Sequence, residues 1–307
     1  MSAIISVPAM SSAQRRRRRW HKRVTPYLFI LVPMILYVCF TLGPVVISLV
    51  MSFTNWDPVR RPAFVGLANY KELFTKDRVF WPALRNTAQY VLEVVPLQLI
   101  IALIVATIVM EKWFRFTTLT RTMYFMPVVV SEISIAMIWT VLYHPTYGVF
   151  NSILKDIGMK PVNWLGSRNT VIHALAFMAV WRSMGYYMVI FMAGLSGIPY
   201  ELYEAAALDG ANKNQSFWRV TLPLLRPTIL FALVIACIGS FQVFGSIYLM
   251  TGGGPSYAST VITWLIYDRG LRSFRMGYGS AIAWVLFSVI FILGLAQIKL
   301  FQREISY

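Results

Sequence analysis

Several charged and amide side chains stand inside long apolar stretches of the sequence, and these are the first candidates for chemistry or binding. Such groups are costly in hydrocarbon, so each is expected to face the interior of a helix bundle or a water-filled cavity. Glu93 and Arg182 either contact a bound substrate or form an internal ion pair that sets the register of two helices. Glu132, which follows Pro127, is expected to be a packing or hinge residue. The other polar residues at this depth are Gln98, Ser240 and Gln242.

The residue patterns of the common enzyme classes are absent from the sequence. No phosphate-binding G-x-x-x-x-G-K-[ST] loop occurs, so ATP hydrolysis is not expected of this chain. His21, His144 and His173 are widely scattered, and neither an H-E-x-x-H motif nor a Cys/His cluster offers a metal site. A G-x-S-x-G nucleophile turn is missing as well. We therefore expect this chain to bind no cofactor and no metal.

The elements that must position these side chains are long apolar stretches. Of the 307 residues, 58% are hydrophobic and only 13% are charged. A helix needs ~20 residues to cross the hydrocarbon core of a bilayer, where its backbone satisfies its own hydrogen bonds. The sequence therefore predicts an all-α integral membrane protein with six transmembrane helices. The predicted spans are 27–53, 86–110, 122–143, 170–195, 226–250 and 277–301.

A dense basic block precedes the first span. Arg15–Arg19 are followed by Lys22 and Arg23, and the whole chain carries a net charge of +16. Basic residues at this place hold the N-terminus in the cytoplasm, and six crossings return the C-terminus to the same side. The position beside an apolar span favours lipid head groups over nucleic acid as the partner of this charge. We expect a basic tail over residues 1–25 and a membrane domain over 26–307.

The loop over 196–225, predicted to be cytoplasmic, contains a short Ala-rich helix. Pro199 suits its first turn, where acidic residues complement the positive end of the helix dipole. Gly210 suits the position just past its last turn, and Ser216 is expected to cap a second short turn. A helix of about ten residues is not stable alone. It therefore either docks into a partner or packs on its own bundle.

The same loop resembles the EAA motif of ABC importer permeases, E-A-A-x3-G-x9-I-x-L-P, with Val220 where the motif has Ile. Two further segments resemble the sugar branch of this family, which includes the maltose and glycerol-3-phosphate permeases. Phe64–Tyr70 is similar to F-x-G-L-x-N-Y, and Leu249–Pro255 is similar to L-T-x-G-G-P. The resemblance runs from about residue 25 to the C-terminus and implies a MetI-like bundle. The EAA matches are Glu204, Ala205, Ala206, Gly210, Leu222 and Pro223.

This resemblance implies a permease subunit of an ATP-driven importer in a bacterial inner membrane. The short helix would be the coupling helix that docks on a cytoplasmic ATPase subunit, through the EAA matches together with Asp209. The implied partners are two ATPase subunits, which would bind ATP and Mg²⁺, a second permease subunit in a heterodimer, and an extracytoplasmic solute-binding protein. The outside loops 54–85 and 251–276 would meet the binding protein.

The resemblance also implies where a sugar would bind. Related maltose permeases contact substrate from the fourth and fifth spans, and alignment on the motifs brings Tyr187 and Ser240 onto such positions, with Gln242 nearby. Aromatic rings stack on the apolar faces of sugars, but ordinary aromatic packing remains an alternative for Tyr187. The candidate residues of the substrate path are Tyr186, Tyr187, Ser240, Gln242, Arg182 and Glu93.

Two other functions are compatible with six apolar spans. A membrane-embedded lipid-modifying enzyme would use Glu93, Glu132 and Arg182 as site groups, but it would not need the Ala-rich cytoplasmic helix. A permease for amino acids, phosphate or metal ions would share the EAA motif, but such permeases usually lack the two flanking segments. An importer subunit for a sugar or a related polyol accounts for all three segments.

Overall fold

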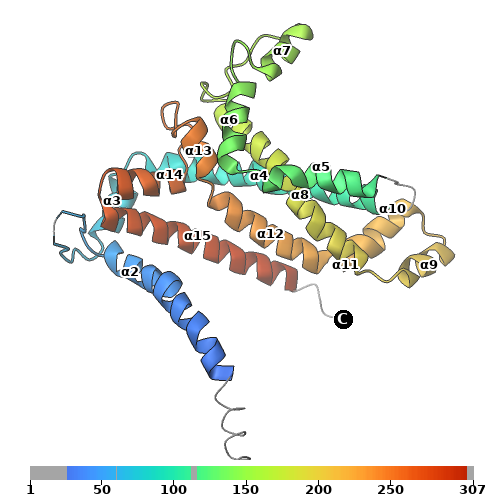
Figure 1. The fold of residues 1–307 in the computed structure, drawn as a ribbon, viewed down its shortest axis with the longest axis horizontal. Coiled ribbons are helices and arrows are strands. Elements are labelled where there is room, and N and C mark those ends of the chain that lie inside the picture. The colour runs from blue at the N-terminus through green and yellow to red at the C-terminus, as the bar shows by residue number, and fades with distance from the viewer. Residues whose placement is uncertain (1–25, 60, 112–115, 303–307) are drawn as a thin grey trace, which may run out of the picture. The chain divides into compact units, whose positions relative to one another are not determined.

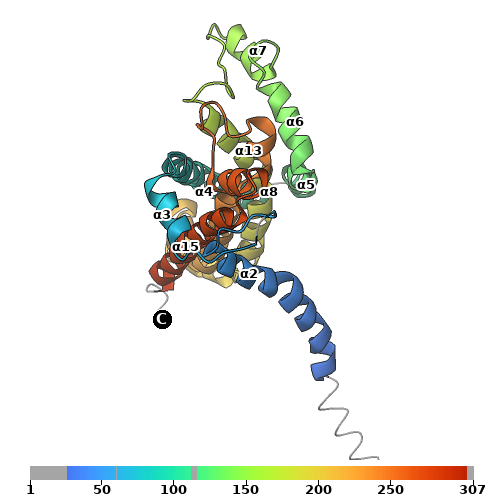
Figure 2. The same cartoon turned by 90° about the vertical axis from the view of Figure 1, so that its left-hand side faces the viewer.

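The computed structural model describes residues 26–59, 61–111 and 116–302, so the predicted basic tail lies outside the described residues. The described chain is mostly helical, and its β pairing is one isolated antiparallel bridge between Thr54 and Phe64. The chain divides into two units, one ending at Met51 and the other beginning at Ser52. Figure 1 shows the elements, and Figure 2 shows them turned by 90°.

The first apolar span runs from Pro26 to Ser52 and agrees with the predicted stretch. A π-helical turn, η1 (Val38–Leu42), precedes α2 (Gly43–Ser52). A Cβ on residue 43 would lie 2.9 Å from the Val38 carbonyl oxygen, so glycine allows the close backbone approach at the end of this π-helical turn. The span is 27 residues long, enough to cross a bilayer.

The second unit is built from long apolar helices that pack on one another. α4 (Phe80–Met110) and α8 (Val171–Ser196) make the most extensive helix contact, and α12 (Arg226–Phe241) packs on both. α15 (Met276–Gln302) packs on α12. Small residues such as Ala102 and Ala106 are fully buried on α4, and small side chains at helix contacts are typical of membrane bundles.

The third predicted span, 122–143, is not one straight helix. It is divided into α5 (Thr117–Val129) and α6 (Glu132–Leu142), which meet at an angle of 97°. Pro127 has no N–H to donate within α5, and the backbone of Val130 and Ser131 is extended. The prediction of a continuous span was therefore wrong, because apolar length does not report whether the backbone stays helical.

The fifth predicted span is also interrupted. α12 ends at Phe241, and α13 (Gly245–Met250) begins only after three non-helical residues, Gln242–Phe244. Residues Arg226–Met250 are together long and apolar enough to cross a bilayer. Irregular backbone at membrane depth is tolerated where it is buried in protein or lines a cavity. The non-helical residues of both interrupted spans are therefore expected to be surrounded by protein or to line a cavity.

Four short helices lie in the segments between the long spans. They are α3 (Ala68–Thr75), α7 (Val149–Asp156), α14 (Ile262–Ile266) and η3 (Tyr267–Arg272). The Asn69 side-chain amide donates to the Ser52 and Thr54 carbonyl oxygens, each at 2.8 Å, so this motif residue fixes the chain that enters α3. The Arg275 Nη2 donates to Glu72 at 2.7 Å, and this hydrogen bond raises the pKa of the Arg275 guanidinium.

Candidate functional site

The short helix predicted in the loop over 196–225 is α9, Glu201–Leu208. Its C-terminus is a Schellman motif, in which the Ala211 N–H donates to the Ala206 carbonyl at 2.9 Å and the Gly210 N–H donates to the Ala207 carbonyl at 3.0 Å. Gly210 has a φ of +80°, a conformation that side chains with a Cβ adopt only at a cost. The glycine of the motif is therefore required by the backbone geometry.

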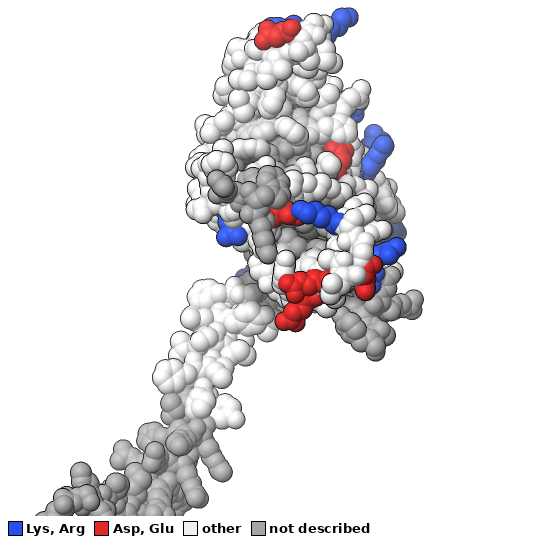
Figure 3. All heavy atoms as spheres, turned by 90° about the vertical axis from the view of Figure 1, so that its right-hand side faces the viewer, with Lys and Arg blue, Asp and Glu red and all other residues white. Residues whose placement is uncertain are grey.

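One face of this loop is open. α9 has no buried residue, and Leu208 is 90% exposed. Glu204 and Ala205 are exposed beside it. Figure 3 looks onto the end of the molecule that carries α9 and shows acidic side chains gathered there. A helix this short is not stable by itself and gains stability by packing. Its exposed leucine, alanine and carboxylate groups are suited to packing in a groove on a partner.

The other face of the loop is anchored to the second unit. The Tyr203 hydroxyl and Thr221 Oγ1 share a hydrogen bond of 3.0 Å, which joins α9 to η2 (Phe217–Thr221). Lys213 Nζ lies 3.0 Å from Glu111 Oε2 at the end of α4. These contacts connect the exposed helix and the loop after it to η2 and to the end of α4.

The predicted cap of the second turn was wrong. Ser216 precedes η2, but its side chain forms no capping hydrogen bond there. The side-chain cap lies at the start of α10 (Lys213–Ser216), where the Asn212 side chain accepts from the Gln215 N–H at 2.9 Å and the Gln215 side chain accepts from the Asn212 N–H. This reciprocal pair is a capping box. Leu222 and Pro223, the last residues of the motif, are half-buried in the next turn, α11 (Leu222–Leu224).

The charged residues at membrane depth form two separate pairs. Arg182 Nη1 lies 3.7 Å from Glu132 Oε2, whereas Glu93 Oε2 lies 2.9 Å from His173 Nδ1. Glu93 Oε1 also accepts from the Gln89 side-chain amide at 3.0 Å. An ion pair between Glu93 and Arg182 is therefore excluded, and Glu132 is the carboxylate that meets the arginine.

Glu132 stands where the two interrupted spans meet. It is the first residue of α6, and its Oε1 accepts a hydrogen bond of 3.0 Å from the Ser246 N–H in the first turn of α13. A carboxylate at a helix N-terminus is stabilised by the helix dipole. A Cβ on Gly245 would lie 2.8 Å from this oxygen, so the absence of a side chain at residue 245 leaves room for the Glu132 carboxylate. The Arg182 Nε atom is buried beside this junction without a hydrogen-bond partner among the described residues.

The two candidate tyrosines differ in their surroundings. Tyr187 is 7% exposed and belongs to the hydrophobic core with Met188 and Phe191, whereas Tyr186 is 38% exposed. Ser240 is likewise 7% exposed, and Gln242 is exposed at the end of α12. Tyr186 and Gln242 are therefore exposed and Arg182 is half-buried, whereas Tyr187 and Ser240 are packed inside the unit.

Two contacts of the polar residues were missed by the sequence analysis. His173, treated as one of three scattered histidines, pairs with Glu93 across the α4–α8 contact. Gln98 accepts a hydrogen bond from the Ser183 hydroxyl across the same contact. All four residues lie within predicted spans, which indicated that each would need a polar partner. The packing of α4 on α8 determines which of them form pairs.

A family model described as "Binding-protein-dependent transport system inner membrane component" matches residues 98–307. The chain belongs to this family. The permease is 36% identical over 284 residues to a probable ABC transporter permease protein, YurN, of Bacillus subtilis, which covers 91% of this chain and 97% of that protein. The arabinooligosaccharide transport permease AraP of Bacillus subtilis is 33% identical, with 95% of this chain and 94% of that protein covered.

Further relatives extend the same pattern. The trehalose/maltose transport permease MalF of Thermococcus litoralis is 34% identical to the permease over 91% of this chain and 94% of that protein. A crystal structure of a bacterial ABC transporter involved in import of the acidic polysaccharide alginate matches with a TM-score of 0.80 and 26% identity, covering 95% of this chain and all of the matched chain. The permease is thus a multi-pass transport subunit of an ABC importer with the predicted all-α bundle, and the lipid-modifying enzyme alternative is wrong.

Proposed function

We propose that the permease provides part of the path for a sugar or related polyol, delivered by an extracytoplasmic binding protein and moved at the expense of ATP. Relatives named for arabinooligosaccharide and trehalose/maltose transport support the sugar class. A solved alginate transporter in complex with an oligosaccharide-bound periplasmic protein supports the delivery step. The complex would contain a second permease subunit and two cytoplasmic ATPase subunits that bind ATP and Mg²⁺. Both termini of the permease would be cytoplasmic.

The observation that carries the proposal is the exposed helix α9. Glu204, Ala205, Ala206, Asp209 and Gly210 would present their face to a groove of an ATPase subunit, with Leu222 and Pro223 in the anchored turn behind it. The hydrogen bond between Tyr203 and Thr221 and the ion pair between Lys213 and Glu111 would carry displacement of α9 into the bundle. A short helix held at its base transmits motion without bending.

The substrate path would pass the junction of the two interrupted spans. Arg182 and Tyr186 on α8 and Gln242 after α12 offer cationic, aromatic and amide groups at this depth. Aromatic faces suit the apolar side of a sugar ring, and the amide and guanidinium suit its hydroxyl groups. Tyr187 and Ser240 would support this surface from the core. Glu93 on α4 is held by Gln89 and by His173, which precedes Arg182 by nine residues on α8, and it would act in shaping the bundle.

The test uses the whole importer, with both permeases, the ATPases and the binding protein, reconstituted in proteoliposomes. We expect ATP-dependent uptake of an oligosaccharide or polyol, and the same class of ligand in the binding protein as it is purified. An amino acid, phosphate or metal ion in the binding protein, with matching uptake, would overturn the sugar assignment. The coupling role is tested separately with Glu204→Lys and Gly210→Asp. If both variants keep ATPase association and uptake intact, the coupling role is contradicted.

A further inference from the structure

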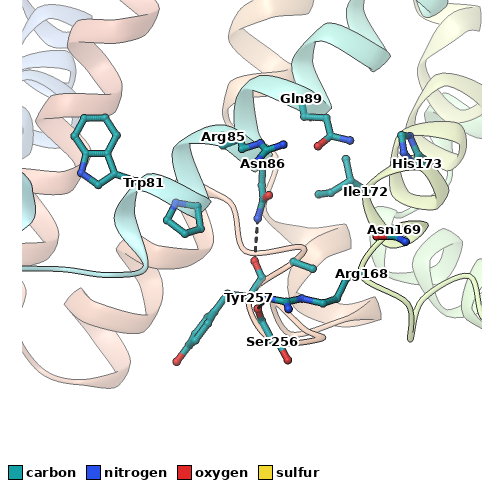
Figure 4. A pocket seen from close by; sticks show the side chains of 12 residues that line it. Trp81, Arg85, Asn86, Gln89, Arg168, Asn169, Ile172, His173, Ser256 and Tyr257 are labelled. Carbon is teal, nitrogen blue, oxygen red and sulfur yellow. Dashed lines mark hydrogen bonds between the residues drawn. The ribbon is translucent and has the colours of Figure 1, made fainter.

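A polar pocket of about 680 Å³ opens where α4 and α8 begin. Figure 4 shows its three walls: the first turns of α4, the start of α8 with the loop before it, and the loop that follows α13. The polar side chains that line it are Arg85, Asn86, Gln89, Arg168, Asn169 and His173. Its position is far from α9, because α8 runs from this pocket to the α9 loop at its other end.

The charge of this pocket is positive. Arg85 and Arg168 both line it and are exposed, and its lining contains no carboxylate. The nearest acid on α4 is Glu93, one turn beyond Gln89, and its oxygens are already bound to Gln89 and His173. A cationic ligand would be repelled by the two guanidinium groups and would find no carboxylate in the lining to bind it. A carboxylate would meet two planar forks of N–H donors, the geometry that arginine offers to such a group.

The guanidinium groups have capacity for a ligand. Arg168 Nη2 donates to the Ser256 carbonyl at 3.4 Å, and a guanidinium group has five N–H donors in all. Arg85 forms no hydrogen bond or ion pair with the part of the chain that the structure describes. Two arginines on different walls of the pocket therefore retain N–H donors for a ligand.

The pocket is held in shape by its own framework. The Asn86 amide donates to the Tyr257 carbonyl at 2.9 Å, drawn as a dashed line in Figure 4, and to the Thr260 carbonyl at 3.0 Å. The Ile262 N–H donates to Thr87 Oγ1 at 3.0 Å. These bonds fix the loop after α13 against α4, so the site does not have to be assembled when a ligand arrives, and this lowers the entropic cost of binding.

We propose that this pocket binds an aspartate or glutamate side chain on the surface of the extracytoplasmic binding protein. The proposal rests on the proposed function, which places α9 in the cytoplasm and the pocket at the outer end of the bundle. Arg182 follows His173 by nine residues on α8, about 14 Å at 1.5 Å per residue. The pocket is thus separate from the candidate sugar path, and its exposed arginines face a docking protein. The carboxylate would orient the binding protein over the path before the sugar is released.

The experiment measures binding of the purified binding protein to the full importer in nanodiscs. We expect Arg85→Gln and Arg168→Gln each to weaken the apparent Kd about tenfold, the scale of one charge-assisted hydrogen bond. Lys160→Gln, an exposed cation outside the pocket, is the matched control and should leave the Kd unchanged. Arg85→Lys should retain part of the affinity, because it keeps the charge and loses the fork.

The salt dependence of wild-type binding tests the proposal even if the arginine variants fail to assemble. Binding of the wild-type complex should weaken as salt rises, since the pair is exposed to screening. Salt-independent wild-type binding, or arginine variants that bind like Lys160→Gln, would overturn the pocket proposal while leaving the importer intact. Variants that keep the Kd but lose uptake of a uronate-containing sugar would also overturn it, in favour of an acid on the substrate. A wild-type importer that binds no binding protein at all would overturn the proposed function, and this proposal with it.

Discussion

Glu132 Oε1 accepts a hydrogen bond of 3.0 Å from the backbone N–H of Ser246, although the two residues are 114 positions apart in the chain. The bond joins the first turn of α6 to the first turn of α13, the two helices that begin after breaks in their spans. The other carboxylate oxygen lies 3.7 Å from Arg182 on α8. Three spans therefore meet at one carboxylate.

Removal of the Glu132 carboxylate should impair this junction. Glu132→Ala leaves the Ser246 N–H and the Arg182 guanidinium without their acceptor, and we expect a loss of about 1–3 kcal/mol in stability and a clear fall in uptake. Glu132→Gln keeps an acceptor for Ser246 and should lose less. The measurement is thermal unfolding of the purified complex together with uptake in proteoliposomes. Equal behaviour of the alanine and glutamine variants would show that the hydrogen bond to Ser246 contributes nothing.

A methyl group at residue 245 should push Glu132 out of its place. The added Cβ of Gly245→Ala would lie 2.8 Å from Glu132 Oε1, so the flexible carboxylate must shift and give up its hydrogen bond to the Ser246 N–H, a loss of ~1–3 kcal/mol. Gly239→Ala is the matched control, because a Cβ there meets nothing within 4 Å. We expect a lower Tm for the first variant and little change for the second. Similar Tm values for both would mean that the junction tolerates displacement of Glu132.

Alanine at residue 210 should distort the end of α9 through the backbone alone. Gly210 has a φ of +80° and an added Cβ would meet nothing within 4 Å, so Gly210→Ala costs ~1–2 kcal/mol of local strain without a clash. Gly158→Ala is a close control, with a φ of +79° and equally open space. We expect only the first to weaken ATPase association in a pull-down of the assembled importer. Weakening by both variants would indicate a general loss of stability instead of a coupling role.

The two neighbouring tyrosines should respond differently to truncation. Tyr186→Ala removes an accessible ring, so we expect a higher apparent KM for uptake with an unchanged Tm. Tyr187→Ala empties part of the core and should cost ~3–5 kcal/mol of stability, in the range of other large aromatic truncations. Thermal unfolding and uptake at several sugar concentrations separate the two effects. A changed KM for Tyr187→Ala with an unchanged Tm would reverse the assignment.

Features that depend on neighbouring residues were accessible from the sequence. Apolar length predicts the spans because hydrocarbon requires ~20 helical residues with satisfied backbone groups, whatever the rest of the chain does. The end of α9 at Gly210 is equally local, since only glycine enters that conformation readily. The motif around Glu204 placed the chain in its family for the same reason: its residues and spacing lie within one loop.

Tertiary structure alone decided which residues meet. Arg182 had two acids available at membrane depth, and packing selected Glu132 and left Glu93 to His173. Successive residues on a helix point about 100° apart, so the rotation of α8 determines that Tyr187 is buried and Tyr186 is accessible. The sequence by itself determined that this chain crosses the membrane and carries a short helix, ended by Gly210, in the loop over 196–225. The helix breaks, the junction at Glu132 and the arginine pocket depend on contacts between distant segments, which local propensity does not encode.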